Sequence, residues 1–261
     1  MIHRLVQALG RVVRAPGLLL TVILAQFALA ALVGRIVRAM ADANLGSFIW
    51  PDGQNLLYGI FELFVENPDI LAGWRVAMGI STLAAYVFWT LIAGAVITRL
   101  HQKQPLSRVA AAGVQWLPAM AVVTLWHMIP RLVLLAFCGV ASRQLMDHGP
   151  TGWIAAALTL GVLFFCVCAL DIARTEIALG RARPFAPRTA LRGFGIALKR
   201  PGVLCASMLF SLVQWLTVVA ILLLAVWGLG TDPSPWLARG LSALGTFCAL
   251  ARIAVAVGHR E

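Results

Sequence analysis

The sequence predicts an all-α polytopic membrane protein with six transmembrane helices, and two observations carry this prediction. Apolar residues make up 61% of the 261-residue chain and charged residues only 12%, with a mean hydropathy of +0.89. Soluble domains average about 45–50% apolar and roughly 25% charged residues, so lipid is the expected solvent for most of this chain. The apolar residues also form continuous runs, without the period of two that marks a membrane β-strand, and this favours helices.

Six segments are long enough to span a bilayer, because about 20 helical residues cross roughly 30 Å of hydrocarbon. They are 17–38, 71–98, 118–141, 153–175, 203–229 and 236–257. We expect the first to be an uncleaved span, since its apolar run continues past the small residues that mimic a signal-peptide cleavage site. Most of the 21 Lys and Arg residues fall in the N-terminal segment, in the loops 99–117 and 174–202, and at the C-terminal end. The positive-inside rule therefore predicts that both termini are cytoplasmic.

One pattern occurs three times in the chain. It consists of a basic stretch, a proline, an apolar run and then a tryptophan at the start of the next span. Its members are Pro16 and Trp74, Pro118 and Trp153, and Pro201 and Trp236. The second and third pairs are each 35 residues apart and the first is 58 apart, so the first copy carries an insertion of 23 residues. We therefore expect one membrane domain, 1–261, made of three tandem repeats: 1–98 with an outer-side insertion at about 42–70, 99–180 and 181–261. Each repeat is predicted to be an interfacial helix followed by a transmembrane hairpin.

The predicted interfacial helices are amphipathic. In the first, apolar residues recur at helical spacing on one side, with Arg4, Arg11 and Arg14 on the other. This pattern is typical of a helix in the headgroup plane whose arginines face anionic lipid. The third copy follows the same plan in a loop for which we expect an interfacial or coupling role. Its basic residues are Arg181, Arg183, Arg188, Arg192, Lys199 and Arg200.

Two further features are assigned to the outer side of the membrane. Trp74, Trp153 and Trp236 are expected to anchor the outer interface, where amphipathic rings are enriched. The insertion at 42–70 contains an apolar run with Glu62 and Glu66. It is interpreted either as a short helix on the outer surface or as a docking element for an extracytoplasmic partner.

Polar residues inside the spans are the candidates for function, because they are costly there. His127 and Arg131 are four residues apart and share a helix face, with Pro130 between them. One interpretation is polar glue between helices. The other is a pathway for a substrate, a lipid headgroup or a proton.

A second cluster, Asp171, Arg174 and Glu176, is expected near the cytoplasmic end of the fourth span. Asp171 is predicted to pair with Arg174 one helical turn away, which leaves Glu176 to meet arginines of the following loop. A structural role, a coupling or partner-docking role and a catalytic role are all open for this cluster.

Several kinds of chemistry lack their residues in this sequence. HExxH, Walker P-loop and GxSxG motifs are absent, and no span carries two carboxylates or two histidines at ligand spacing. The five cysteines all lie in apolar runs and form no CxxC pair. The net charge of +11 is explained by basic residues that flank spans, so nucleic acid is not an expected partner. No catalytic residue, metal or cofactor is expected, and an enzyme is less favoured than a non-enzyme.

The stretch "DIARTEIALGRARPFAPRTALRGFGIALKRPGVL", which starts at Asp171, resembles a group of uncharacterised bacterial six-span inner-membrane proteins. In that group an "xxAR" after a span leads into a basic amphipathic helix and the next hairpin. The resemblance covers about 35 residues closely and implies a bacterial inner membrane, but no activity.

Three hypotheses of function follow. The first is a non-enzymatic subunit or scaffold of a larger membrane complex, with the lipid bilayer, anionic lipids at the cytoplasmic face and other membrane proteins as partners. The second is a permease-like transporter component that works with a cytoplasmic ATPase, since the N-terminal helix is similar to the elbow helices of ABC-type permeases. The third is an intramembrane lipid-modifying enzyme centred on His127 and Arg131.

Overall fold

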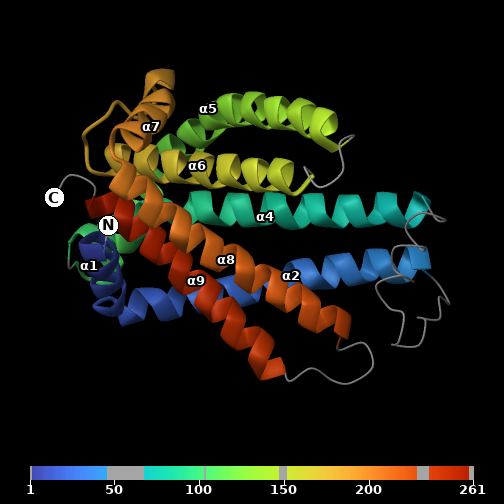
Figure 1. The fold of residues 1–261 in the computed structure, drawn as a ribbon. Coiled ribbons are helices and arrows are strands. Elements are labelled where there is room, and N and C mark those ends of the chain that lie inside the picture. Colours follow the sequence, from blue (N-terminus) through green and yellow to red (C-terminus); the bar gives the residue numbers. More distant parts are fainter. Residues whose placement is uncertain (1, 46–67, 103, 147–151, 228–234, 259–261) are drawn as a thin grey trace. The chain divides into compact units, whose positions relative to one another are not determined.

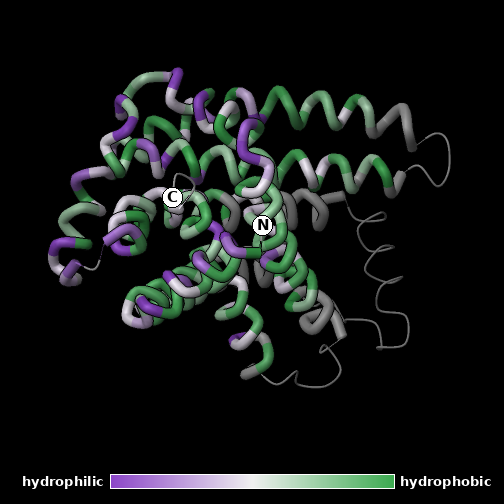
Figure 2. Tube along the Cα trace, turned by 60° about the vertical axis from the view of Figure 1, so that its left-hand side comes forward, coloured by the Kyte–Doolittle hydropathy of each residue, from purple (hydrophilic) through white to green (hydrophobic). Residues whose placement is uncertain are grey.

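The computed structural model describes residues 2–45, 68–102, 104–146, 152–227 and 235–258 (Figure 1). Every regular element within these ranges is helical. The α-helices are α1 (Ile2–Val13), α2 (Pro16–Leu45), α4 (Pro68–His101), α5 (Leu106–Met146), α6 (Gly152–Ala178), α7 (Pro187–Lys199), α8 (Pro201–Trp227) and α9 (Pro235–Val257). Six of them, namely α2, α4, α5, α6, α8 and α9, are long and apolar enough to cross a membrane. Each contains one of the predicted spans, in whole or for most of its length, and Figure 2 shows how largely hydrophobic they are.

The chain divides into two compact units. The first comprises Met1–Leu18, Thr90–Gln214 and Phe247–Glu261, and so holds α1, α5, α6 and α7 whole together with parts of α2, α4, α8 and α9. The second comprises Leu19–Trp89 and Trp215–Thr246. All the candidate residues on α5, α6 and α7 belong to the first unit.

Two proline positions follow the sequence prediction and one does not. Pro16 begins α2 directly after the amphipathic α1, and Pro201 begins α8 directly after the amphipathic α7. Pro118 does not separate an interfacial helix from a span as the pattern predicted, because α5 runs through it and through Pro130 as one 41-residue helix. A proline inside a helix removes only its own N–H bond, and neighbouring groups can satisfy the freed carbonyl in a membrane helix.

The elements that the sequence assigns to the outer side are described only in part. Trp153 and Trp236 are the second residues of α6 and α9, whereas Trp74 is the seventh residue of α4. Their side chains lie outside the described structure. The predicted insertion overlaps the end of α2 and the start of α4, and its middle, residues 46–67, also lies outside the described residues.

Small residues allow close helix contacts in the first unit. A Cβ added at Gly94 of α4 would lie 2.9 Å from Cβ of Trp116 on α5, and one at Gly113 would lie 3.1 Å from Cβ of Ala95. Helices in lipid gain little from hydrophobic burial, because the acyl chains are as apolar as the helix side chains. They associate instead through close van der Waals contacts, which small residues permit. The α4–α5 crossing is therefore set by these glycines.

Helix α1 packs against the ends of two spans. Its Ala8 and Val12 are buried, while Ile2, Val6 and Val13 are exposed. An added Cβ at Gly258, just after α9, would lie 3.2 Å from Nη1 of Arg11. A cation suits this place, because the C-terminal end of a helix carries a partial negative charge.

The second unit has its own polar contact between spans. The hydroxyl of Thr246 on α9 donates a hydrogen bond to Oε1 of Gln26 on α2. A Cβ added at Gly245 would lie 2.9 Å from Oγ1 of Thr217 on α8, so α8 and α9 approach closely there. The first contact gives polar side chains a partner that lipid could not supply, and the second allows two helices to approach closely at a small residue.

Candidate functional site

The end of α6 carries a short run of charged residues that is buried throughout. Residues 171–176, which we call the α6 hub, contain Asp171, Arg174 and Glu176, and these are 5%, 5% and 1% exposed. The run is helical, with the hydroxyl of Thr175 donating to the carbonyl of Asp171 at 2.8 Å. Three charges within six helical residues point in different directions around α6, so each meets a different set of neighbours.

Asp171 connects α6 to α9 and α8. Its Oδ2 accepts a hydrogen bond from Nε of Arg252 at 2.6 Å, and Nη1 of Arg252 donates to Oε1 of Gln214 at 3.0 Å. Arg252 lies on α9 and Gln214 on α8. A short charge-assisted bond of this kind is roughly twice as strong as a neutral one.

Arg174 connects α6 to α4 and α5. Its Nη2 donates to the hydroxyls of Thr90 at 2.8 Å and of Thr124 at 2.7 Å. Thr124 in turn donates to the carbonyl of Met120 one turn earlier on α5. The sequence spacing predicted an Asp171–Arg174 pair within α6, whereas the structure places Arg252 against Asp171 and turns Arg174 to these hydroxyls.

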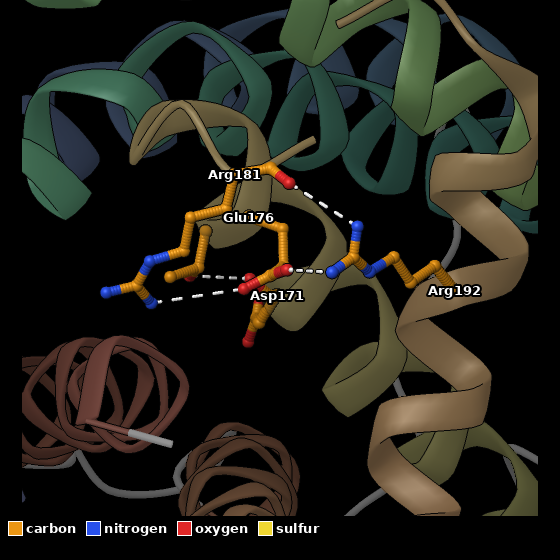
Figure 3. A network of polar contacts seen from close by, with 5 residues as sticks. Asp171, Glu176, Arg181 and Arg192 are labelled. Atoms are coloured by element: carbon orange, nitrogen blue, oxygen red, sulfur yellow. Dashed lines mark hydrogen bonds and ion pairs between the residues drawn. The ribbon is translucent and has the colours of Figure 1, made fainter. Parts of the chain in front are cut away.

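Glu176 connects α6 to α7, as the sequence predicted when it assigned this carboxylate to arginines of the following loop. Its Oε2 lies 3.3 Å from Nη2 of Arg192 on α7, and its Oε1 lies 3.9 Å from Nη1 of Arg181 (Figure 3). Nη1 of Arg192 also donates to the carbonyl of Arg181 at 3.4 Å. The two arginines therefore reach the same buried carboxylate from α7 and from the loop before it.

The loop that carries Arg181 is fixed by the way α6 ends. Gly180 has a φ of 67°, which a residue with a Cβ adopts only with strain. The N–H of Arg181 donates to the carbonyl of Glu176 at 2.8 Å, and the N–H of Gly180 to that of Ile177 at 2.9 Å. This is the Schellman arrangement, and it turns the chain away from the helix axis toward α7.

His127 lies between three helices. It is fully buried on α5, and its ring stacks on that of Phe194 of α7, with centroids 4.7 Å apart and an interplanar angle of 7°. Phe194 also meets Phe165 of α6 at 5.4 Å. Arg131, one turn further along α5, is half-buried. The structure thus connects His127 of α5 to α7 through Phe194.

The basic loop residues divide into two groups. Arg181 and Arg192 contact Glu176, although the side chain of Arg192 is 46% exposed, and Arg183, Arg188 and Lys199 are exposed as well. Arg200 forms the turn between α7 and α8, where its N–H donates to the carbonyl of Ala197 at 3.4 Å. From the sequence, all six were expected to share one interfacial or coupling role.

Four residues of the network were missed by sequence analysis: Thr90, Thr124, Gln214 and Arg252. The three polar neutral residues carry no signal in a single sequence. Arg252 had one, because it lies six residues before Gly258 just as Arg174 lies six residues before Gly180, at the ends of two spans with similar sequences.

The three charges of the α6 hub contact side chains or loop residues that link α6 to α4, α5, α7 and α9, and Arg252 extends the network from Asp171 to α8. Among the described residues, no three His, Cys, Asp or Glu side chains gather as a metal site would require. Comparison with protein-family models, with curated proteins and with solved structures gives no match for the chain. What the geometry offers chemically is a set of interhelical contacts near the ends of the spans.

Proposed function

We propose that the protein is a non-enzymatic integral protein of the bacterial inner membrane, with both termini in the cytoplasm, that acts as a subunit or scaffold of a larger membrane complex. The observation that carries the proposal is the α6 hub. A charged side chain within a membrane span is costly, so it usually marks a substrate or ion pathway. Here each hub charge contacts a side chain of another helix, and holding helices together is sufficient reason for its presence.

The surface of the spans supports the same proposal. Helix α5 exposes large apolar side chains along much of its length, including Leu125, Leu132 and Phe137 at 68%, 61% and 75%. Apolar side chains on a membrane helix contact either lipid or another membrane protein. Helices with such faces suit a subunit that partners pack against.

Native mass spectrometry of the full chain, extracted with its surrounding lipid, tests the proposal. We expect defined partner chains bound in a fixed ratio. The variant Leu125→Ala/Leu132→Ala alters one exposed face of α5, because residues seven apart lie on the same side of a helix, and Leu83→Ala on α4 serves as a control at another exposed position. The subunit proposal would be contradicted if the wild-type protein were extracted only as a monomer or a homo-oligomer.

A second candidate is a permease-like subunit that works with a cytoplasmic ATPase, and one observation favours it. Helix α7 lies between two spans in the sequence and is ion-paired through Arg192 to the α6 hub. A displacement of α7 would therefore be transmitted to the helices that the hub contacts. ATP-dependent uptake by proteoliposomes that contain the co-purified complex tests this candidate. Uncoupling by Arg192→Gln, with Arg183→Gln as the exposed control, would support it, and equal uptake by both variants would count against it.

A further inference from the structure

Helix α7 is held on α6 in one fixed rotation. Its buried side consists of small residues: Thr189, Ala190, Gly193 and Ala197. A Cβ at Gly193 would overlap the carbonyl oxygen of Ala169 on α6 and would lie 3.1 Å from Cβ of Ala173. Backbone therefore meets backbone at this crossing, and the remaining sides of α7 face fixed directions.

Two contacts show what those directions are. Phe194 meets Phe165, and Arg192 meets Glu176. Phe165 and Glu176 are 11 residues apart on α6, or roughly 16.5 Å along its axis at 1.5 Å per residue. One flank of α7 thus points back along the span, and the other points toward the end of α6.

The exposed residues of α7 sort onto the same two flanks. At 100° per residue, Leu191 and Leu198 fall on the flank of Phe194, and Arg188 and Lys199 fall on the flank of Arg192. Leu191 and Leu198 are 59% and 66% exposed, and both basic side chains are exposed as well. The apolar flank therefore points into the span region and the basic flank toward the end of α6, where a headgroup layer would lie.

We propose that Arg188 and Lys199 form a binding surface for the phosphates of anionic phospholipid headgroups. Leu191 and Leu198 insert beside them into the upper acyl region. The inference rests on the membrane placement given under the proposed function, and it adds the residues that contact lipid. Charge complementarity favours this occupant, since two cations beside exposed leucines match an anionic headgroup above its acyl chains.

The same geometry excludes a neighbouring arginine from this role. Arg192 lies on the basic flank but contacts the buried carboxylate of Glu176. Its side chain is 46% exposed, but its guanidinium is held against a carboxylate that it shares with Arg181. Lipid contact is therefore assigned to Arg188 and Lys199, and an ion pair within the protein to Arg192.

The test uses the full chain in detergent micelles, titrated with phosphatidylglycerol or phosphatidylcholine, with bound lipids counted by native mass spectrometry. A basic residue near an anionic membrane surface contributes about fivefold in affinity. Arg188→Gln/Lys199→Gln should therefore weaken phosphatidylglycerol binding about 25-fold. Arg188→Lys/Lys199→Arg, which keeps both charges, should retain binding within about twofold, and so should Arg192→Gln.

Three results would overturn the proposal. The first is equal binding of the two lipids by the wild-type protein, and the second is an unchanged affinity of the Arg188→Gln/Lys199→Gln variant for phosphatidylglycerol. The third is full displacement of the lipid by excess inorganic phosphate, which would indicate a phosphate site instead. Bound partner chains are seen in the same spectra. Loss of lipid selectivity with partner chains retained would refute this inference alone, and absence of partner chains with lipid selectivity retained would refute only the subunit proposal.

Discussion

Two glycines of α7 give a sharp test of how this helix is docked. Gly193 faces the carbonyl of Ala169, whereas Gly195, two residues on, has nothing within 4 Å of an added Cβ. Replacing glycine by alanine inside a helix contributes up to about 1 kcal/mol by propensity. Gly195→Ala should therefore stabilise the docked helix by about 0.5–1 kcal/mol.

The same substitution at Gly193 should have the opposite sign. The added methyl group meets a backbone oxygen that cannot rotate away, and overpacking of this kind costs about 1–3 kcal/mol. Separation of α7 from α6 also weakens the Phe194–His127 stack, which contributes about 0.5–1.5 kcal/mol. After the gain in propensity, we expect a net loss of about 1–2 kcal/mol, so the two variants should differ by about 2 kcal/mol.

Hydrogen exchange measured by mass spectrometry reads this difference directly. A loss of 1–2 kcal/mol speeds exchange of the α7 amides about 5- to 30-fold in Gly193→Ala, while Gly195→Ala should slow it. Peptides from α5 serve as an internal reference. Similar exchange in the two variants would refute the account of α7 docking through Gly193.

The other predictions concern close helix contacts and polar contacts. Gly94→Ala should lower the melting temperature in detergent through an overpacking cost of about 1–3 kcal/mol, while Gly79→Ala, with open space around it, should raise it slightly. Thr124→Val should cost about 1–3 kcal/mol in SDS unfolding because it removes a buried partner of an arginine, whereas Thr98→Val, whose hydroxyl bonds only its own helix, should cost under about 0.5 kcal/mol. Phe194→Leu should speed α7 exchange about 2- to 12-fold through loss of the ring stack.

The spans and the two amphipathic helices could be predicted because their signals are local. Length and continuous apolarity identify a span, and Pro16 and Pro201 lie where an amphipathic helix gives way to a span. Pro118 has the same local setting but lies inside α5. The difference depends on which neighbouring groups hydrogen-bond to the backbone carbonyls near the proline, and the local sequence does not identify those groups. The three-repeat arrangement stays a prediction.

The contacts of the α6 hub were predictable only in part, for a related reason. Helical spacing identifies neighbours within one helix, so it pointed from Asp171 to Arg174. The partner in the structure, Arg252, lies 81 residues further along the chain. Glu176 was assigned correctly because its partners lie in the segment that follows α6 directly. Contacts across helices depend on which spans pack together, and that information is tertiary.

A double-mutant cycle on Asp171 and Arg252 tests most directly whether the buried charges hold the helices together. Asp171→Asn and Arg252→Gln each leave a buried charge without its ion-pair partner, which costs about 3–5 kcal/mol. The double variant removes both charges, so we expect it to be less destabilised than the sum of the single variants, with a coupling energy of at least about 2 kcal/mol in SDS unfolding. Additive losses with no coupling would contradict the structural role of the α6 hub and would direct attention to these charges as part of a transport or catalytic pathway.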